Sequence, residues 1–164
     1  MSHYDEALAS TVPVKGALMV PGSVEETDAL ERFKAFYAVF SRERIESMAG
    51  GVYAENAYFR DGIREVRGLP EIQSYFISST EAIELCVFDI EDGVGRRGEY
   101  YFRWVMHLTL KRNKDETIVA PGMSHVRFNG EGKVIFHQDY WDTSLILEPV
   151  PVLGSLIRWI KRRI

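Results

Sequence analysis

The chain has 164 residues, of which 46% are hydrophobic and 27% charged, and its net charge is −4. This length and composition predict one globular domain with tails, and the charge gives no reason to expect nucleic acid as a partner. No apolar run approaches the roughly 20 residues that span a bilayer, and no cationic and apolar leader opens the chain. Its single cysteine, Cys86, sits in an apolar run. We therefore expect a cytoplasmic protein whose cysteine is buried and reduced.

The first half of the chain is predicted to be mainly helical. Residues 1–26 include Pro13 and Gly22, which break any periodicity, so we expect a flexible extension or an arm on a partner. Apolar residues at helical spacing then predict an amphipathic helix that begins at Thr27. A second helix is expected over 43–52 and a third over 70–76, with a short strand at 57–61 between them.

The pattern then changes to the period of two that is typical of strands. Four long strands are predicted, at 82–91, 99–112, 117–128 and 133–142, with turns at 92–95, 113–116 and 129–132. Pro149 and Pro151 separate a last helix, 153–164, from a domain that spans 27–147. This order predicts an α+β fold in which helices cover one face of a curved antiparallel sheet.

The last predicted strand carries ionisable and aromatic side chains at an unusual density, namely His137, Asp139, Tyr140, Trp141 and Asp142. Charged groups in a core require partners or a function, so this strand is the expected wall of a pocket. Alternation places Ser124, His137, Asp139 and Trp141 on the inner face, with Ser124 opposite His137 and Gly122 opposite Asp139. His107 and His125 then point outward, which argues against a metal site with His137.

The chain resembles the SnoaL-like proteins of the nuclear transport factor two superfamily, which includes ketosteroid isomerase. The resemblance covers about residues 28–142 and rests on four motifs, which are YAENAYFRD at 53–61, GLPEIQSYF at 68–76, FNGEGKV at 128–134 and DYWD at 139–142. It implies a cystatin-like cone of curved antiparallel sheet with a mixed edge and with helices in its concave face. It also implies a homodimer.

The comparison with ketosteroid isomerase implies roles for individual residues. Asp61 matches the general base at the end of the short strand, and Tyr37 matches the tyrosine that stabilises the oxyanion. Ser124 stands where that enzyme has its second donor, a protonated aspartate, and Trp141 matches its aromatic wall. Limonene epoxide hydrolase offers a thinner match, because its Arg-x-Asp pair would fall near Trp104 and Met106.

These observations predict a protein that binds a small hydrophobic, carbonyl-bearing molecule, with acid–base isomerase or cyclase chemistry on it. The catalytic candidates are Asp61, Tyr37, Asp139 and His137, and the ligand-binding candidates are Tyr53, Phe59, Trp104, Met106, Ser124 and Trp141. Structural alternatives stay open: Asp61 pairs with a neighbouring arginine, Tyr37 is a core aromatic, and Asp139 belongs to a hydrogen-bond network. No phosphate-binding glycine loop or metal set is evident, so no cofactor is expected.

The last helix, 153–164, suggests a different class of function. Leu156, Ile157 and Ile160 share one face, and four cations crowd the rest. Such a helix docks on its own domain or on a dimer mate, or it makes peripheral contact with an anionic membrane. The alternative reading is therefore a non-catalytic module that binds a ligand or a protein, held at a membrane by this helix.

Overall fold

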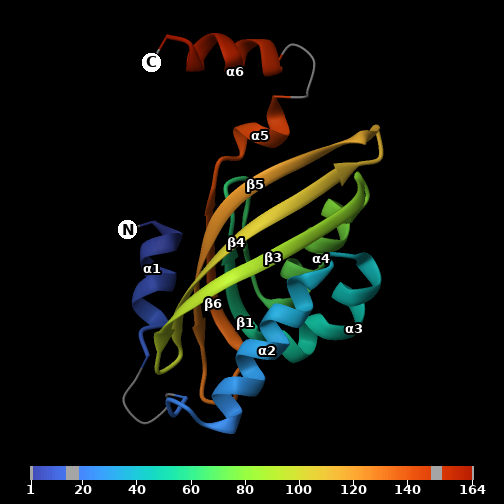
Figure 1. Ribbon diagram of the computed structural model, residues 1–164. Coiled ribbons are helices and arrows are strands. Elements are labelled where there is room, and N and C mark those ends of the chain that lie inside the picture. The colour runs from blue at the N-terminus through green and yellow to red at the C-terminus, as the bar shows by residue number, and fades with distance from the viewer. Residues whose placement is uncertain (1, 14–18, 149–152, 164) are drawn as a thin grey trace.

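Three of the helices pack against one side of a curved six-stranded sheet (Figure 1). The structure is a computed structural model that describes residues 2–13, 19–148 and 153–163. Its elements are α1 (His3–Ser10), α2 (Val24–Ala38), α3 (Arg42–Val52), β1 (Tyr53–Arg60), β2 (Glu65–Arg67), α4 (Leu69–Thr80), β3 (Ile83–Arg96), β4 (Glu99–Leu110), β5 (Asn113–Phe128), β6 (Val134–Trp141), α5 (Ser144–Leu147) and α6 (Leu153–Lys161). The strand order is β2-β1-β6-β5-β4-β3, and only β1 and β6 run parallel among these neighbours. The predicted α+β fold with a mixed sheet is confirmed.

Of the three central helices, α2 and α3 each begin at a capping serine, and α4 has a proline in its first turn. Helix α2 begins at Val24 and not at Thr27 as predicted, because the hydroxyl of Ser23 accepts the N–H of Glu26 at 3.1 Å. Pro70 lies in the first turn of α4, where its missing N–H costs little. The inner sides of α2, α3 and α4 meet the concave face of the sheet in one core, which includes Phe33, Phe36, Ile45, Ile72, Phe76, Phe102 and Leu108.

Two features of the sheet differ from the predicted pattern. Strand β3 continues to Arg96, so the predicted turn at 92–95 is wrong; the turn falls at Arg97–Gly98, both of which have positive φ. Ser124 pairs with Asp139 and not with His137, because the turn pairs Phe128 with Val134 instead of Lys133 and the register shifts by one more residue next to Phe128. The error amounts to two residues, so Ser124, His137, Asp139 and Trp141 stay on their predicted inner face.

Helix α1 covers part of the convex face of the sheet, on the side opposite α2, α3 and α4 (Figure 1). Residues 1–26 were expected to form an extension or an arm, and within them the structure places α1, whose Ala7 is buried against Tyr58 and Phe136. Arg127 on β5 is buried by α1: its guanidinium donates to the carbonyl of Leu8 at 2.6 Å.

Two short helices follow the sheet. Helix α5 continues from β6, and α6 lies beyond it, at the same end of the molecule as the turn between β4 and β5 (Figure 1). The ammonium of Lys161 in α6 pairs with Glu148 at 2.7 Å and with Asp142 at 3.3 Å. The predicted break at Pro149 and Pro151, and the end of the predicted helix at Ile164, lie outside the described residues. Among the helices that the structure describes, none has both the length and the apolar character needed to cross a membrane.

Candidate functional site

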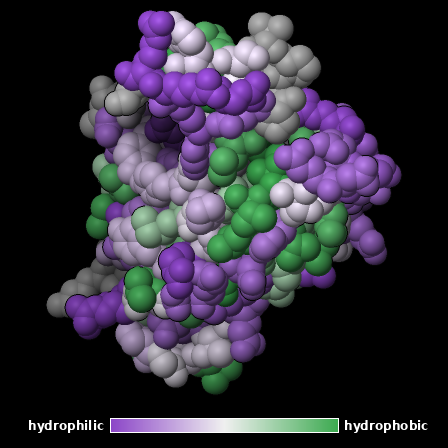
Figure 2. All heavy atoms as spheres, turned by 45° about the horizontal axis from the view of Figure 1, so that its top comes forward, coloured by the Kyte–Doolittle hydropathy of each residue, from purple (hydrophilic) through white to green (hydrophobic). Residues whose placement is uncertain are grey.

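A cavity of about 530 Å³ opens between the concave face of the sheet and helices α2, α4 and α5. Its buried end is lined by Tyr37, Phe59, Phe76, Trp104, Met106 and Leu108, and its exposed end by Ile63, Ala82, Lys111 and Arg112. Figure 2 turns the α6 end toward the viewer and shows apolar side chains gathered there between charged ones. The volume and the apolar wall are those of a site for a small hydrophobic molecule.

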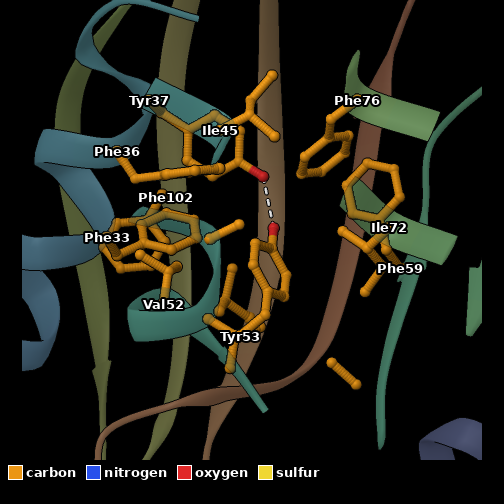
Figure 3. Close-up of a cluster of buried hydrophobic side chains, with 14 of the residues drawn as sticks. Phe33, Phe36, Tyr37, Ile45, Val52, Tyr53, Phe59, Ile72, Phe76 and Phe102 are labelled. Atoms are coloured by element: carbon orange, nitrogen blue, oxygen red, sulfur yellow. Dashed lines mark hydrogen bonds between the residues drawn. The ribbon is translucent and has the colours of Figure 1, made fainter. Parts of the chain in front are cut away.

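A line of hydrogen bonds runs along the inner end of this cavity. The hydroxyls of Tyr37, on α2, and Tyr53, at the start of β1, point toward one another at 2.5 Å (Figure 3). The Tyr53 hydroxyl lies 2.6 Å from Nδ1 of His137, and Nε2 of His137 lies 2.8 Å from Oδ1 of Asp139. We call these four residues the buried network. Tyr37 and Asp139 line the cavity, whereas Tyr53 and His137 lie behind them.

Asp139 is oriented from a second side. The hydroxyl of Ser124 donates to Oδ1 of Asp139 at 2.5 Å, and Nε1 of Trp104 donates to the Ser124 oxygen at 2.8 Å. The Trp104 ring fits there because position 122 is glycine: a Cβ on Gly122 would lie 2.2 Å from the ring. Oδ1 of Asp139 thus accepts hydrogen bonds from Ser124 and from His137, and the bond to Ser124 also fixes the ring of Trp104 in the cavity wall.

Burial keeps the two tyrosines in their neutral form. Desolvation, reinforced by the nearby negative charge of Asp139, raises the pKa of Tyr37 well above its usual value. Desolvation also raises the pKa of Tyr53, against a smaller opposing effect of the hydrogen bond from Tyr37. Both hydroxyls therefore keep their hydrogens at neutral pH and act as hydrogen-bond donors rather than as phenolates.

Two arrangements of hydrogens satisfy the buried network while Asp139 is ionised. In the first, neutral His137 donates from Nε2 to Asp139 and accepts the hydrogen of Tyr53 at Nδ1, and Tyr53 accepts that of Tyr37. In the second, protonated His137 donates to Tyr53, Tyr53 donates to Tyr37, and the Tyr37 hydrogen is left for a molecule in the cavity. The charge on His137 therefore decides whether Tyr37 presents an acceptor or a donor to the cavity.

Asp61 lines the same cavity but has a different environment. Its Oδ1 accepts the backbone N–H groups of Ile63 and Arg64, each at 2.7 Å, and its Oδ2 accepts the hydroxyl of Tyr75 at 2.6 Å. These three bonds close the turn after β1 and fix the direction of the carboxylate. The predicted pairing with a neighbouring arginine is not the arrangement that the structure has; Arg64 lies over the ring of Tyr75.

The structure brings most of the predicted site residues together. Tyr37, Phe59, Asp61, Trp104, Met106, Asp139 and Trp141 all line the main cavity. Ser124 and His137 border a small recess behind it, and Tyr53 reaches the site only through its hydroxyl. The sequence reading missed Tyr75, although the helical spacing around it in the motif at 68–76 offered a signal. Among the described residues, no group of three or more His, Cys, Asp and Glu side chains could hold a metal ion.

Comparison with known proteins identifies the family. The model of the SnoaL-like domain matches residues 33–137. A proposed isomerase of the SnoaL-like family from Agrobacterium tumefaciens str. C58 is 19% identical, with 73% of this chain and 99% of that chain covered and a TM-score of 0.59. A proposed SnoaL-like polyketide cyclase from Jannaschia sp. CCS1 is 10% identical, with 79% and 96% covered and a TM-score of 0.64.

A third similar structure is an NTF2-like protein of unknown function from Burkholderia pseudomallei K96243. It is 10% identical, covers 79% of this chain and 100% of its own, and has a TM-score of 0.66. No curated protein matches the chain. These structures share the fold, and the domain match spans more than half of the sequence. The chain belongs to the SnoaL-like family.

Proposed function

We propose that the protein binds a small hydrophobic molecule with a carbonyl or enol oxygen and catalyses an isomerase or cyclase step on it. The observation that carries this proposal is the buried network, because it ends in a hydroxyl, that of Tyr37, at the inner wall of an apolar cavity. An apolar wall with one cluster of polar groups is the usual form of a site that orients one oxygen atom of its ligand. The isomerase and cyclase among the similar structures agree with this class of chemistry.

The proposed mechanism gives Tyr37 and Asp61, which both line the cavity, different roles. With His137 protonated, Tyr37 donates a hydrogen bond to the ligand oxygen, and the hydrogens of Tyr53 and His137 follow in the same direction. A proton that moves along this line neutralises the developing enolate, and His137 is left neutral beside Asp139. Asp61, whose carboxylate is fixed in the same cavity, is the proposed base that takes the proton from carbon.

Hydrogen exchange at carbon tests the chemistry without knowledge of the final product. Ketones and enones would be incubated with the protein in D2O, and deuterium next to the carbonyl would be followed by mass spectrometry. A bound compound should exchange faster with the protein than without it. Tyr37→Phe should lower this exchange about 100-fold or more, which is the usual loss when one oxyanion donor is removed. Asp61→Asn should lower it by a similar factor.

A matched control separates the site from general effects of a lost hydroxyl. Tyr58 is as buried as Tyr53, and its hydroxyl has no hydrogen-bond partner in the described part of the chain. Tyr58→Phe should therefore leave exchange unchanged. A ligand that binds without any exchange would leave a binding module, in which the buried network is structural. If no apolar carbonyl compound raises the unfolding temperature, the proposal is wrong, since a ligand at about 100 times its Kd adds roughly 2.7 kcal/mol.

A further inference from the structure

Helix α6 presents an exposed apolar stripe at the surface. Trp159 and Ile160 lie three and four residues after Leu156, and the three side chains are 51%, 42% and 52% exposed in that order. Side chains at this spacing share one side of a helix. Large apolar side chains that stand together in water mark an interaction surface more often than single exposed ones do. The cavity does not explain the exposure of these apolar side chains, which indicates a separate function of α6.

The charges around this stripe are all positive. Residues 153–164 contain Arg158, Lys161, Arg162 and Arg163 and no acid, in a chain whose net charge is −4. Arg158 and Lys161 hold α6 to the segment before it, through the carbonyl and the carboxylate of Glu148. Arg162 and Arg163 form no ion pair with any residue that the structure describes, and the guanidinium of Arg163 lies 4.2 Å from the centre of the Trp159 ring.

We infer that α6 docks on an anionic lipid membrane, with its apolar stripe in the headgroup region and its free cations on the lipid phosphates. A short helix with aliphatic and tryptophan side chains on one face and lysine or arginine on the other binds at such an interface. Tryptophan favours the headgroup level, and each cation near the surface adds attraction to acidic lipid. An apolar protein groove would take the stripe as well, but it would give no role to Arg162 and Arg163 beside it.

The position of α6 relates this surface to the cavity. Helix α5, which contacts α6, supplies Ile146 to the cavity wall. Lys111 and Arg112, at the exposed end of the cavity, come from the turn between β4 and β5, which lies at the same end of the molecule as α6 in Figure 1. Docking through α6 thus brings the cavity opening close to the bilayer. The docking itself does not depend on the proposed catalysis.

Co-sedimentation with lipid vesicles tests the inference on the full chain. The protein should sediment with vesicles that contain phosphatidylserine and not with pure phosphatidylcholine, and added salt should release it. The pair of changes Arg162→Gln and Arg163→Gln should weaken binding about fivefold for each charge, as expected for a cation at an acidic surface. Leu156→Ser with Ile160→Ser should abolish binding.

Matched changes on the sheet give the control. Leu85 and Val119 are 50% and 52% exposed, on strands outside α6, so Leu85→Ser with Val119→Ser should leave vesicle binding intact. Trp159 fluorescence should shift to the blue with acidic vesicles, and this shift should vanish in Trp159→Phe. The inference is overturned if the protein never sediments or if it binds both kinds of vesicle equally. It is also overturned if Leu156→Ser with Ile160→Ser breaks a dimer in gel filtration, because the stripe would then face a second copy.

Discussion

Removal of the Tyr53 hydroxyl should cost much more stability than removal of the Tyr58 hydroxyl. Both tyrosines lie on β1 and are 0% and 2% exposed, and both lose one oxygen on change to phenylalanine. The Tyr53 oxygen, however, bonds to Tyr37 at 2.5 Å and to His137 at 2.6 Å, whereas that of Tyr58 has no partner among the described residues. The pair therefore isolates the contribution of the buried network.

The expected loss in the free energy of unfolding follows from these contacts. Two buried hydrogen bonds contribute about 1 kcal/mol each, and the Nδ1 of His137 that is left without its partner adds about 1–3 kcal/mol of desolvation cost. Tyr37, at 3.4 Å from the same Nδ1, can recover part of this by moving closer. We expect Tyr53→Phe to lower the free energy of unfolding by about 2–4 kcal/mol. Tyr58→Phe should leave it unchanged or raise it, because this change removes a buried hydroxyl that has no partner among the described residues.

Urea unfolding followed by circular dichroism would measure both variants against the parent chain. For a chain of this size, each kcal/mol corresponds to roughly 2–4 °C in Tm, so Tyr53→Phe should also melt at least about 4 °C lower. Equal losses in the two variants would mean that the hydrogen bonds of the buried network add nothing beyond the burial of the rings. That result would remove the structural basis for the hydrogen arrangements described above.

Three further results are expected. Gly122→Ala should cost about 1–3 kcal/mol in urea unfolding, because its methyl group meets the Trp104 ring; an unchanged midpoint would contradict this packing. Cys86 is 2% exposed and burial raises its pKa to about 12, so Ellman's reagent should label native protein far more slowly than unfolded protein, and rapid native labelling would oppose it. The fold raises the pKa of Tyr37 and of Tyr53. Their contribution to stability is therefore full below about pH 10, where unfolded tyrosine ionises, and is lost as the pH rises through the folded pKa values. The loss of stability at alkaline pH should then be less steep in Tyr53→Phe than in the parent chain.

The faces of the strands could be predicted from the sequence, whereas their exact pairing could not. Alternation placed His137 and Asp139 inward, and both lie there. The register shift next to Phe128 depends on where the strand pair accommodates one extra residue, and the local sequence pattern does not predict that position. Likewise the fold of α1 depends on Phe136 and Tyr58, residues far away in sequence that it covers.

The candidate site, too, could be predicted from the sequence only in part. A polar strand in an apolar setting was enough to predict a cavity wall and to name Asp139 and His137. The order of the buried network was not predictable, because Tyr37, Tyr53 and His137 come from three elements whose distances only the packed fold sets. The three bonds that hold Asp61 were missed for a related reason. Two of them come from backbone N–H groups in the turn after β1 and the third from the Tyr75 hydroxyl, and the helical spacing at 68–76 does not specify which carboxylate that hydroxyl reaches.

Helix α5 belongs both to the cavity wall and to the support of α6. Ile146 forms part of the cavity wall, and the same four-residue helix packs against α6. A ligand that displaced Ile146 would therefore disturb the helix against which α6 packs, and a movement of α6 would disturb the wall. Thermodynamic linkage makes such an effect reciprocal. If a ligand in the cavity changes the affinity of α6 for a surface by some factor, binding of that surface changes the affinity of the cavity for the ligand by the same factor. Capture and release of a ligand would then depend on where the protein is docked.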